Sequence, residues 1–211
     1  PTGIDIDKFK ITPSMKKNIQ TIKNKYKIKD TDFVIGSVGR IAPEKSFDKL
    51  LYNIKDMIKV NTNIKVLLVG GGPDLDNLKE LTKKLNLENY VIFTDKVNYD
   101  LVPTYFNIFN VVVSFSKTET QGLTIIEGLA ASKPTLCIED DSFRAMIEPN
   151  YNGYLFKNDT EFKDYIFKLM NDQKLYKDMS TNARNSTYKY SKEVFAADIL
   201  KVYHKAIENK H

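Results

Sequence analysis

Two carboxylates with a glycine between them form the first candidate site of this sequence. Glu119 and Glu127 lie eight positions apart in the stretch "SKTETQGLTIIEGLAASKP", and Gly122 separates them. Glu119 belongs to a polar loop, whereas Glu127 falls in an apolar pattern that predicts a helix. Carboxylates accept hydrogen bonds from hydroxyls, and the amides at a helix start attract anions. The stretch therefore suits a ligand with hydroxyls and an anionic group, although Gly122 alone is equally compatible with a simple turn.

Two cations five residues apart form the second candidate site. Arg40 and Lys45 follow the apolar run "FVIGSVG". A guanidinium binds phosphate oxygens with two parallel hydrogen bonds, and an ammonium contributes a compact charge. Taken alone, they are more simply two surface residues of a loop. Together with the carboxylates they match a nucleoside diphosphate sugar, with Glu127 on the ribose and Glu119 on the transferred sugar.

Alternating apolar runs and helical patterns predict the elements that position these residues. Apolar runs occupy 33–39, 64–70, 90–94, 109–116, 134–138 and 152–156, and helical patterns separate them. This alternation predicts an α/β fold, a doubly wound, Rossmann-like parallel sheet of about six strands. In the strand order 3-2-1-4-5-6, the first and fourth strands are neighbours where the winding reverses, and ligands bind there. The fold would thus bring the cations close to the carboxylates.

Composition excludes several classes of protein. The chain has 211 residues, 42% hydrophobic and 28% charged, which fits one globular domain and excludes disorder. No apolar run approaches the length of a membrane span. The single cysteine, Cys137, lies in the apolar run "PTLCI", so we expect a buried thiol in a reducing compartment.

The net charge of +5 comes partly from the lysine-rich segment "MKKNIQTIKNKYKIK". Met15, Ile19, Ile22 and Tyr26 have helical spacing in it, so the lysines are expected on a solvated face. Attraction to anionic lipid is the functional alternative. No interleaved aromatic and basic pattern indicates binding of nucleic acid.

Other candidate residues favour structural roles. Glu139, Asp140 and Asp141 are consecutive, but no further residue at a suitable spacing completes a metal site, so a solvated loop is expected. His204 lies in the C-terminal helical pattern and His211 is the last residue, and neither has a partner for catalysis in the sequence.

Several stretches, in order along nearly the whole chain, resemble the C-terminal half of a GT-B glycosyltransferase of the retaining family four. They are "PTGIDIDKF", "VGRIAPEKSFDKLL", "LLVGGGPDLDNL", "VIFTDKVNYDLVPTYFNIFNVVVSFS", "ETQGLTIIEGLAASKP" and "NGYLF". The resemblance implies that residues 1–211 form the nucleotide-sugar-binding C-terminal domain of a longer two-domain protein. Residues 1–30 would be a linker and first helix region, and residues 173–211 the terminal helices.

The resemblance also implies a role for each candidate residue. Arg40 and Lys45 would hold the diphosphate and act in catalysis with Glu119, which would contact the donor sugar. Main-chain groups at Gly122, Leu123 and Thr124 would bind the phosphates and the sugar, and Glu127 would bind the ribose. Val97, with Leu101 as a neighbour, would contact the base. The "GGGP" loop, which includes Gly71, would lie beside the nucleotide.

The implied activity is transfer of a sugar, glucose in the first instance, from a UDP-sugar to a lipid or glycan acceptor. "TETQGLT" resembles the bacterial diacylglycerol glucosyltransferases, which suggests glycolipid and cell-envelope synthesis. The implied partners are the nucleotide-sugar donor and an N-terminal acceptor-binding domain, with no metal and no other cofactor. We expect a cytoplasmic location, extending to peripheral association with the inner face of the membrane.

Three positions depart from the family pattern. The family commonly has glycine where this chain has Ser46, Asp95 and Ser132. Ser46 and Asp95 lie near the expected phosphate and base sites, so an inactive, degenerate transferase is one alternative. A nucleotide- or sugar-phosphate-binding regulatory Rossmann module without catalysis is another.

Overall fold

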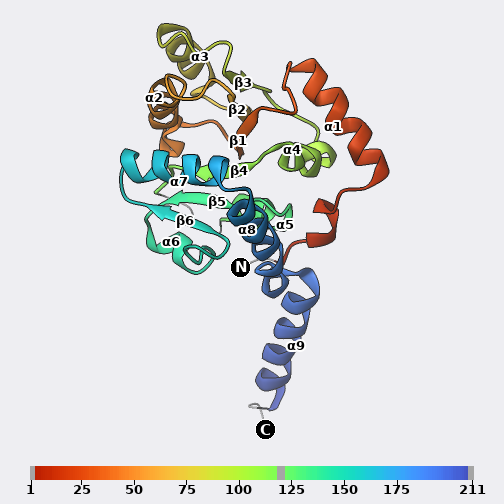
Figure 1. Cartoon of the computed structure of the whole chain (residues 1–211). Helices are drawn as coiled ribbons and strands as arrows, with labels where there is room; N and C mark the ends of the chain where they lie inside the picture. Colours follow the sequence, from red (N-terminus) through yellow and green to blue (C-terminus); the bar gives the residue numbers. More distant parts are fainter. Residues whose placement is uncertain (1–2, 118–121, 209–211) are drawn as a thin grey trace.

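The computed structural model describes residues 3–117 and 122–208 and shows an open parallel sheet with helices on both faces (Figure 1). The six strands are β1 (Phe33–Val38), β2 (Ile64–Val69), β3 (Val91–Phe93), β4 (Val111–Ser114), β5 (Thr135–Ile138) and β6 (Gly153–Phe156). Their order is β3-β2-β1-β4-β5-β6 and every pairing is parallel. The predicted doubly wound sheet and its strand order are confirmed.

The register places the ends of β1 and β4 side by side. Ile35 pairs with Val111 and Gly36 with Val112, and β1 pairs with β2 along its whole length. The loops that leave β1 and β4 therefore emerge at the same edge of the sheet, where the connections turn to opposite sides. This is the position at which the sequence predicts the ligand.

The α-helices between the strands are α2 (Phe47–Met57), α3 (Leu75–Lys84), α4 (Val102–Ile108), α5 (Leu123–Ala130), α6 (Asp141–Arg144) and α7 (Asp159–Asn171), and α1 (Pro13–Lys25) precedes β1. Helix α2 contacts α3 and α7, whereas α4 contacts α1 and α5. Helices α8 (Gln173–Asn185) and α9 (Lys192–Glu208) follow, and α9 extends away from the body (Figure 1). Short 3-10 turns are η1 (Ile6–Phe9), η2 (Pro43–Lys45), η3 (Tyr99–Leu101) and η4 (Tyr188–Tyr190).

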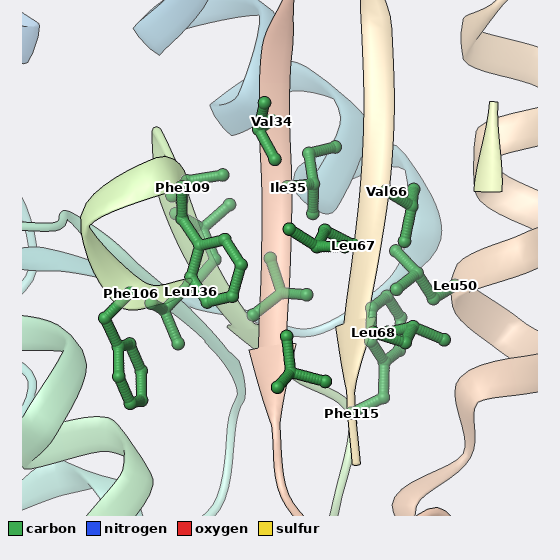
Figure 2. Packing of buried hydrophobic residues seen from close by; sticks show 14 of the residues in the cluster. Val34, Ile35, Leu50, Val66, Leu67, Leu68, Phe106, Phe109, Phe115 and Leu136 are labelled. Carbon is green, nitrogen blue, oxygen red and sulfur yellow. The ribbon is translucent and has the colours of Figure 1, made fainter. Parts of the chain in front are cut away.

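The core lies between the sheet and its two helix layers. Strand residues such as Ile35 and Leu67 are fully buried, and Phe106 and Phe109 belong to the same hydrophobic core (Figure 2). Cys137 is also fully buried, as predicted. Burial of these apolar side chains is the main stabilising contribution to the fold, and it fixes the strand ends that carry the site.

Helix α1 has the face that its spacing predicts. Ile22 is buried, while Ile19 and Tyr26 are half-buried against the core. Lys16, Lys17 and Lys25 lie on the exposed side. Within the described residues, no helix is both long enough and apolar enough to cross a membrane.

The three positions where the resembled family commonly has glycine share one backbone conformation. Ser46, Asp95 and Ser132 have φ angles of 51°, 60° and 61°, in the left-handed region. A side chain in this region costs about 1–2 kcal/mol, which glycine avoids. Ser46, Asp95 and Ser132 therefore hold a backbone conformation that favours glycine, at a cost in stability.

Candidate functional site

Helix α5 begins beside the carboxyl ends of β1 and β4. Gly122 precedes it with φ 59°, in the left-handed region, and a Cβ atom there would lie 2.4 Å from Cε of Met146. The left-handed φ favours glycine at this position, whereas the flexible end of Met146 could move away from an added side chain. Leu123 and Thr124 are the first helical residues, so the helix itself supplies no acceptor for their amides. The helix start therefore offers backbone donors and a positive dipole end to an anion.

A cavity of about 330 Å³ lies between this helix start and the loop after β1. Arg40 and Lys45 line it from the β1 side, and Gly122, Leu123 and Thr124 line it from the β4 side. The structure thus brings together five of the residues that the sequence assigns to the diphosphate. Two cations and a helix start around one hollow suit a ligand of high negative charge.

The two cations differ in how they are held. Arg40 is exposed, and its Nη1 lies 4.0 Å from Oε1 of Glu44, a weak surface pair. Lys45 is half-buried at the end of η2, where its amide donates to the carbonyl of Ala42 over 2.9 Å. Arg40 can therefore turn toward a ligand at little cost, whereas the backbone of Lys45 is fixed.

A second cavity, of about 460 Å³, receives Glu127 from the next turn of α5. Tyr99 and Pro103 line it from the α4 side, and Ile4 and Phe9 line it from the N-terminal segment. Burial raises the pKa of Glu127 to about 7, and no described residue makes a hydrogen bond or ion pair that lowers it again. A half-buried carboxyl of this kind is suited to bind hydroxyl groups.

A third cavity, of about 330 Å³, lies beside the glycine loop after β2. Gly71, Lys96, Val97 and Tyr99 line it. The loop lies tightly against the loop after β1, since a Cβ atom on Gly70 would be 2.0 Å from the carbonyl oxygen of Gly39. The glycine loop therefore approaches the backbone of the loop after β1 closely, beside the cavity.

The three cavities adjoin one another through shared lining residues. Arg40 lines the first and third, Leu123 the first and second, and Tyr99 the second and third. The predicted phosphate, ribose and base positions therefore surround one region at the carboxyl ends of β1, β2 and β4.

One predicted residue, Leu101, stands apart from this arrangement, and the position of another is not described. Glu119 lies outside the described residues. Leu101 packs against the hydrophobic core instead of lining the three cavities.

Sequence reasoning missed Tyr99 and the N-terminal wall. The ring of Tyr99 is 72% exposed at the junction of two cavities. The position of this aromatic residue, two residues after Val97, was the available signal in the sequence. Segment 3–9 lines the Glu127 cavity, although its sequence carries no local pattern for such a contact.

The acidic run after β5 has structural roles. Asp140 caps α6 by accepting from the amide of Ser142 over 3.0 Å, and Glu139 and Asp141 both pair with Arg144. Among residues 3–117 and 122–208, no cluster of three or more potential metal ligands is found.

Comparison with known proteins gives the family. The family described as "Glycosyl transferases group 1" matches residues 18–186. The chain belongs to this family. The predicted assignment to the glycosyltransferases is thereby confirmed, and residues 18–186 include Arg40, Lys45 and Glu127.

Curated relatives in the group 1 family include enzymes named for lipid and polymer acceptors. The alpha-monoglucosyldiacylglycerol synthase of Acholeplasma laidlawii is 32% identical over 203 residues, which are 96% of this chain and 51% of that protein. The poly(ribitol-phosphate) alpha-N-acetylglucosaminyltransferase of Staphylococcus aureus is 30% identical over 83% of this chain and 37% of that protein. The chain thus spans about half or less of the length of these relatives.

Solved structures share the fold. Anabaena HepE in complex with UDP superposes with a TM-score of 0.85 and 21% identity, covering 96% of this chain and 56% of HepE. The C-terminal domain of the group 1 protein LpcC from Francisella tularensis gives a TM-score of 0.76 at 23% identity. That match covers 90% of this chain and 99% of the LpcC domain.

Proposed function

We propose that this chain is the donor-binding domain of a retaining glycosyltransferase that uses a UDP-sugar. The observation that carries the proposal is the set of adjoining cavities at the ends of β1 and β4. They gather Arg40, Lys45, the start of α5 and Glu127. UDP is favoured as the nucleotide because the related HepE and S. aureus TarM were solved with UDP.

In this proposal the diphosphate occupies the cavity of Arg40 and Lys45. The amides at the start of α5 and the two cations stabilise the charge that develops on the departing nucleoside diphosphate. The start of α5 and the backbone of Lys45 are fixed by the fold before the ligand arrives, and the exposed Arg40 side chain turns toward the ligand as it binds, so little reorganisation is needed during the reaction. Glu119 positions the transferred sugar from the loop before α5.

The nucleoside occupies the two flanking cavities. Glu127 binds the ribose hydroxyls, and the base lies between the glycine loop and Val97. The exposed ring of Tyr99 offers a stacking surface at the same place, a contribution of about 1–3 kcal/mol. No metal or further cofactor is part of the proposal.

Glucose as the sugar and diacylglycerol-based lipid as the acceptor are the finer part of the proposal. The synthases of A. laidlawii and Streptococcus pneumoniae, 32% and 28% identical, carry this chemistry in their names and support it. A glycan acceptor is supported in the same way by the S. aureus relative. The acceptor is expected to bind mainly to an N-terminal half, and the whole enzyme to act in the cytoplasm at the inner face of the membrane.

Calorimetric titration of this chain with UDP, UDP-glucose and inorganic phosphate tests donor binding. UDP should bind more tightly than phosphate, and Arg40→Ala should weaken UDP about tenfold, since it removes a charge-assisted contact. Arg144→Ala is the matched control, because Arg144 lies on α6 and pairs with Glu139 and Asp141.

Three results would contradict parts of the proposal. A natural chain that does not bind UDP would exclude the donor-binding function. Equal losses from the two arginine variants would exclude the phosphate site. Equal affinities of the natural chain and Glu127→Ala would exclude the ribose assignment.

A further inference from the structure

At the far end of α5, a largely buried guanidinium joins three segments. Arg184 lies in the last turn of α8, and its side chain is 14% exposed. Its Nη1 donates to the carbonyls of Ile6 and Ala130, and each of these two distances is 2.5 Å. Its Nη2 donates to Oδ1 of Asp7 over 3.0 Å. One side chain thus connects α8, α5 and η1.

One of these contacts satisfies a backbone carbonyl that needs a partner. Ala130 is the last residue of α5, and a helix leaves its final carbonyls without N–H donors within the helix. A cation at this end also interacts favourably with the helix dipole. Only a guanidinium presents several N–H groups in a fixed plane, so an ammonium cannot reproduce all three bonds.

The segment that Arg184 holds is a wall of the Glu127 cavity. Gly3, Ile4, Lys8 and Phe9 line that cavity opposite Glu127 and Leu123 of α5. The same segment is also tied to the end of the chain, since the amide of Ile4 donates to Tyr190 and the amide of Lys192 donates to Ile4, each over 2.9 Å. The spacing between the two walls therefore depends on how η1 is fixed to α5.

We propose that Arg184 is a positioning residue of the nucleotide site. It fixes segment 3–9 against α5, so that the cavity around Glu127 has the width of a nucleoside before the ligand binds. The inference rests on the proposed function. It adds that the ribose side of the site is preorganised by a residue of α8 that touches no part of the nucleotide.

Substitution Arg184→Lys tests the proposal, because it keeps the positive charge and removes the planar set of N–H groups. Amides of residues 4–10 should exchange hydrogen faster in this variant. UDP affinity should fall about tenfold. Affinity for inorganic pyrophosphate should stay within about twofold, because Arg40 and Lys45 line the first cavity and segment 3–9 does not.

Two matched controls separate this effect from general loss of stability. Arg144→Lys makes the same chemical change on α6 and should alter neither affinity. Asp7→Asn removes the ion pairs of Asp7 with Arg184 and Lys10 but keeps both carbonyl contacts of Arg184, and Asp7 is 68% exposed, so this variant should behave like the natural chain.

The outcomes are distinct. Unchanged exchange in residues 4–10 overturns the proposal, and so does an equal loss of UDP and pyrophosphate affinity. If the natural chain binds no UDP, the proposed function fails and the exchange result alone decides whether Arg184 holds the segment. If Arg184→Lys does not fold, exchange of the natural chain with and without UDP replaces it. Absence of added protection in residues 4–10 then overturns the proposal.

Discussion

Helix α5 begins where Gly122, Leu123 and Thr124 line the cavity of Arg40 and Lys45, and it ends where Arg184 donates to the carbonyl of Ala130. At the first end the donors of the backbone lie beside a hollow. At the second end the acceptors are met by protein groups. The difference teaches that one helix serves two purposes, with a ligand-binding start and a closed, structural end.

The cations near the two ends show the same contrast. Arg40 and Lys45 line the open cavity, whereas Nζ of Lys133 donates to the carbonyl of Asn107 over 3.2 Å. Burial lowers the pKa of Lys133 to about 8. The cations near the helix start thus line a cavity that a ligand can enter, while the cation after the helix end binds a backbone carbonyl of the protein itself.

The largest effect is expected from removing both cations at the helix start. Arg40→Ala combined with Lys45→Ala should weaken UDP by a hundredfold or more, about 3 kcal/mol, because two charge-assisted contacts are lost. Lys133→Ala should leave the affinity of the folded protein unchanged. Calorimetry on all three proteins checks the contrast, which breaks down if Lys133→Ala is as damaging as the double substitution.

The next effect concerns the carboxyl in the second turn. Burial raises the pKa of Glu127 to about 7, so the folded chain binds a proton that the unfolded chain releases. The free energy of unfolding should therefore fall as pH rises from about 4.5 to about 7, by about 2 kcal/mol. Glu127→Gln should remove this part of the pH dependence, which urea denaturation at several pH values measures. A slope identical in both proteins would show that Glu127 is solvated.

A smaller effect is expected from the backbone at the helix start. Gly122→Val places a β-branched side chain at φ 59°, which should distort the first turn and weaken UDP about tenfold. Gly122→Asn should weaken it less, since asparagine tolerates the left-handed region. Titration of the two variants with UDP gives the ranking, and equal affinity of all three proteins would show that the ligand does not use this turn.

The smallest effect is expected at Ser132, two residues after Ala130, the last residue of α5. Ser132 has φ 61°, so Ser132→Gly should raise the free energy of unfolding by about 0.5–1 kcal/mol without altering UDP affinity. Ser180→Gly, inside α8, is the control and should lower it by a similar amount. Urea denaturation measures both, and destabilisation by Ser132→Gly would contradict the assigned strain.

Much of the fold could be predicted because its signals are local. Continuous apolar runs identified the buried strands, and the order of a doubly wound sheet then placed the loops after β1 and β4 together. The shared cavity of Arg40 and Thr124 follows from that topology.

The rest depends on contacts between distant segments. The bond between Arg184 and Ile6 joins residues at opposite ends of the chain, and neither end carries a local pattern that indicates it. Leu101 illustrates the same difficulty, because spacing alone could not tell whether it faces a cavity or the core. Tyr99 shows that exposure, which only the packed structure gives, can single out a residue that resembles its neighbours.

The three left-handed residues Ser46, Asp95 and Ser132 have a consequence at the level of the gene. Codons for serine and aspartate can each arise from a glycine codon by a single G-to-A change. A lineage whose mutations favour A over G would gain such replacements first at glycines where the backbone can hold a small polar side chain. Substitution by glycine at Ser132, which lines none of the three cavities, is therefore a short route to a more stable protein with an unaltered ligand pocket.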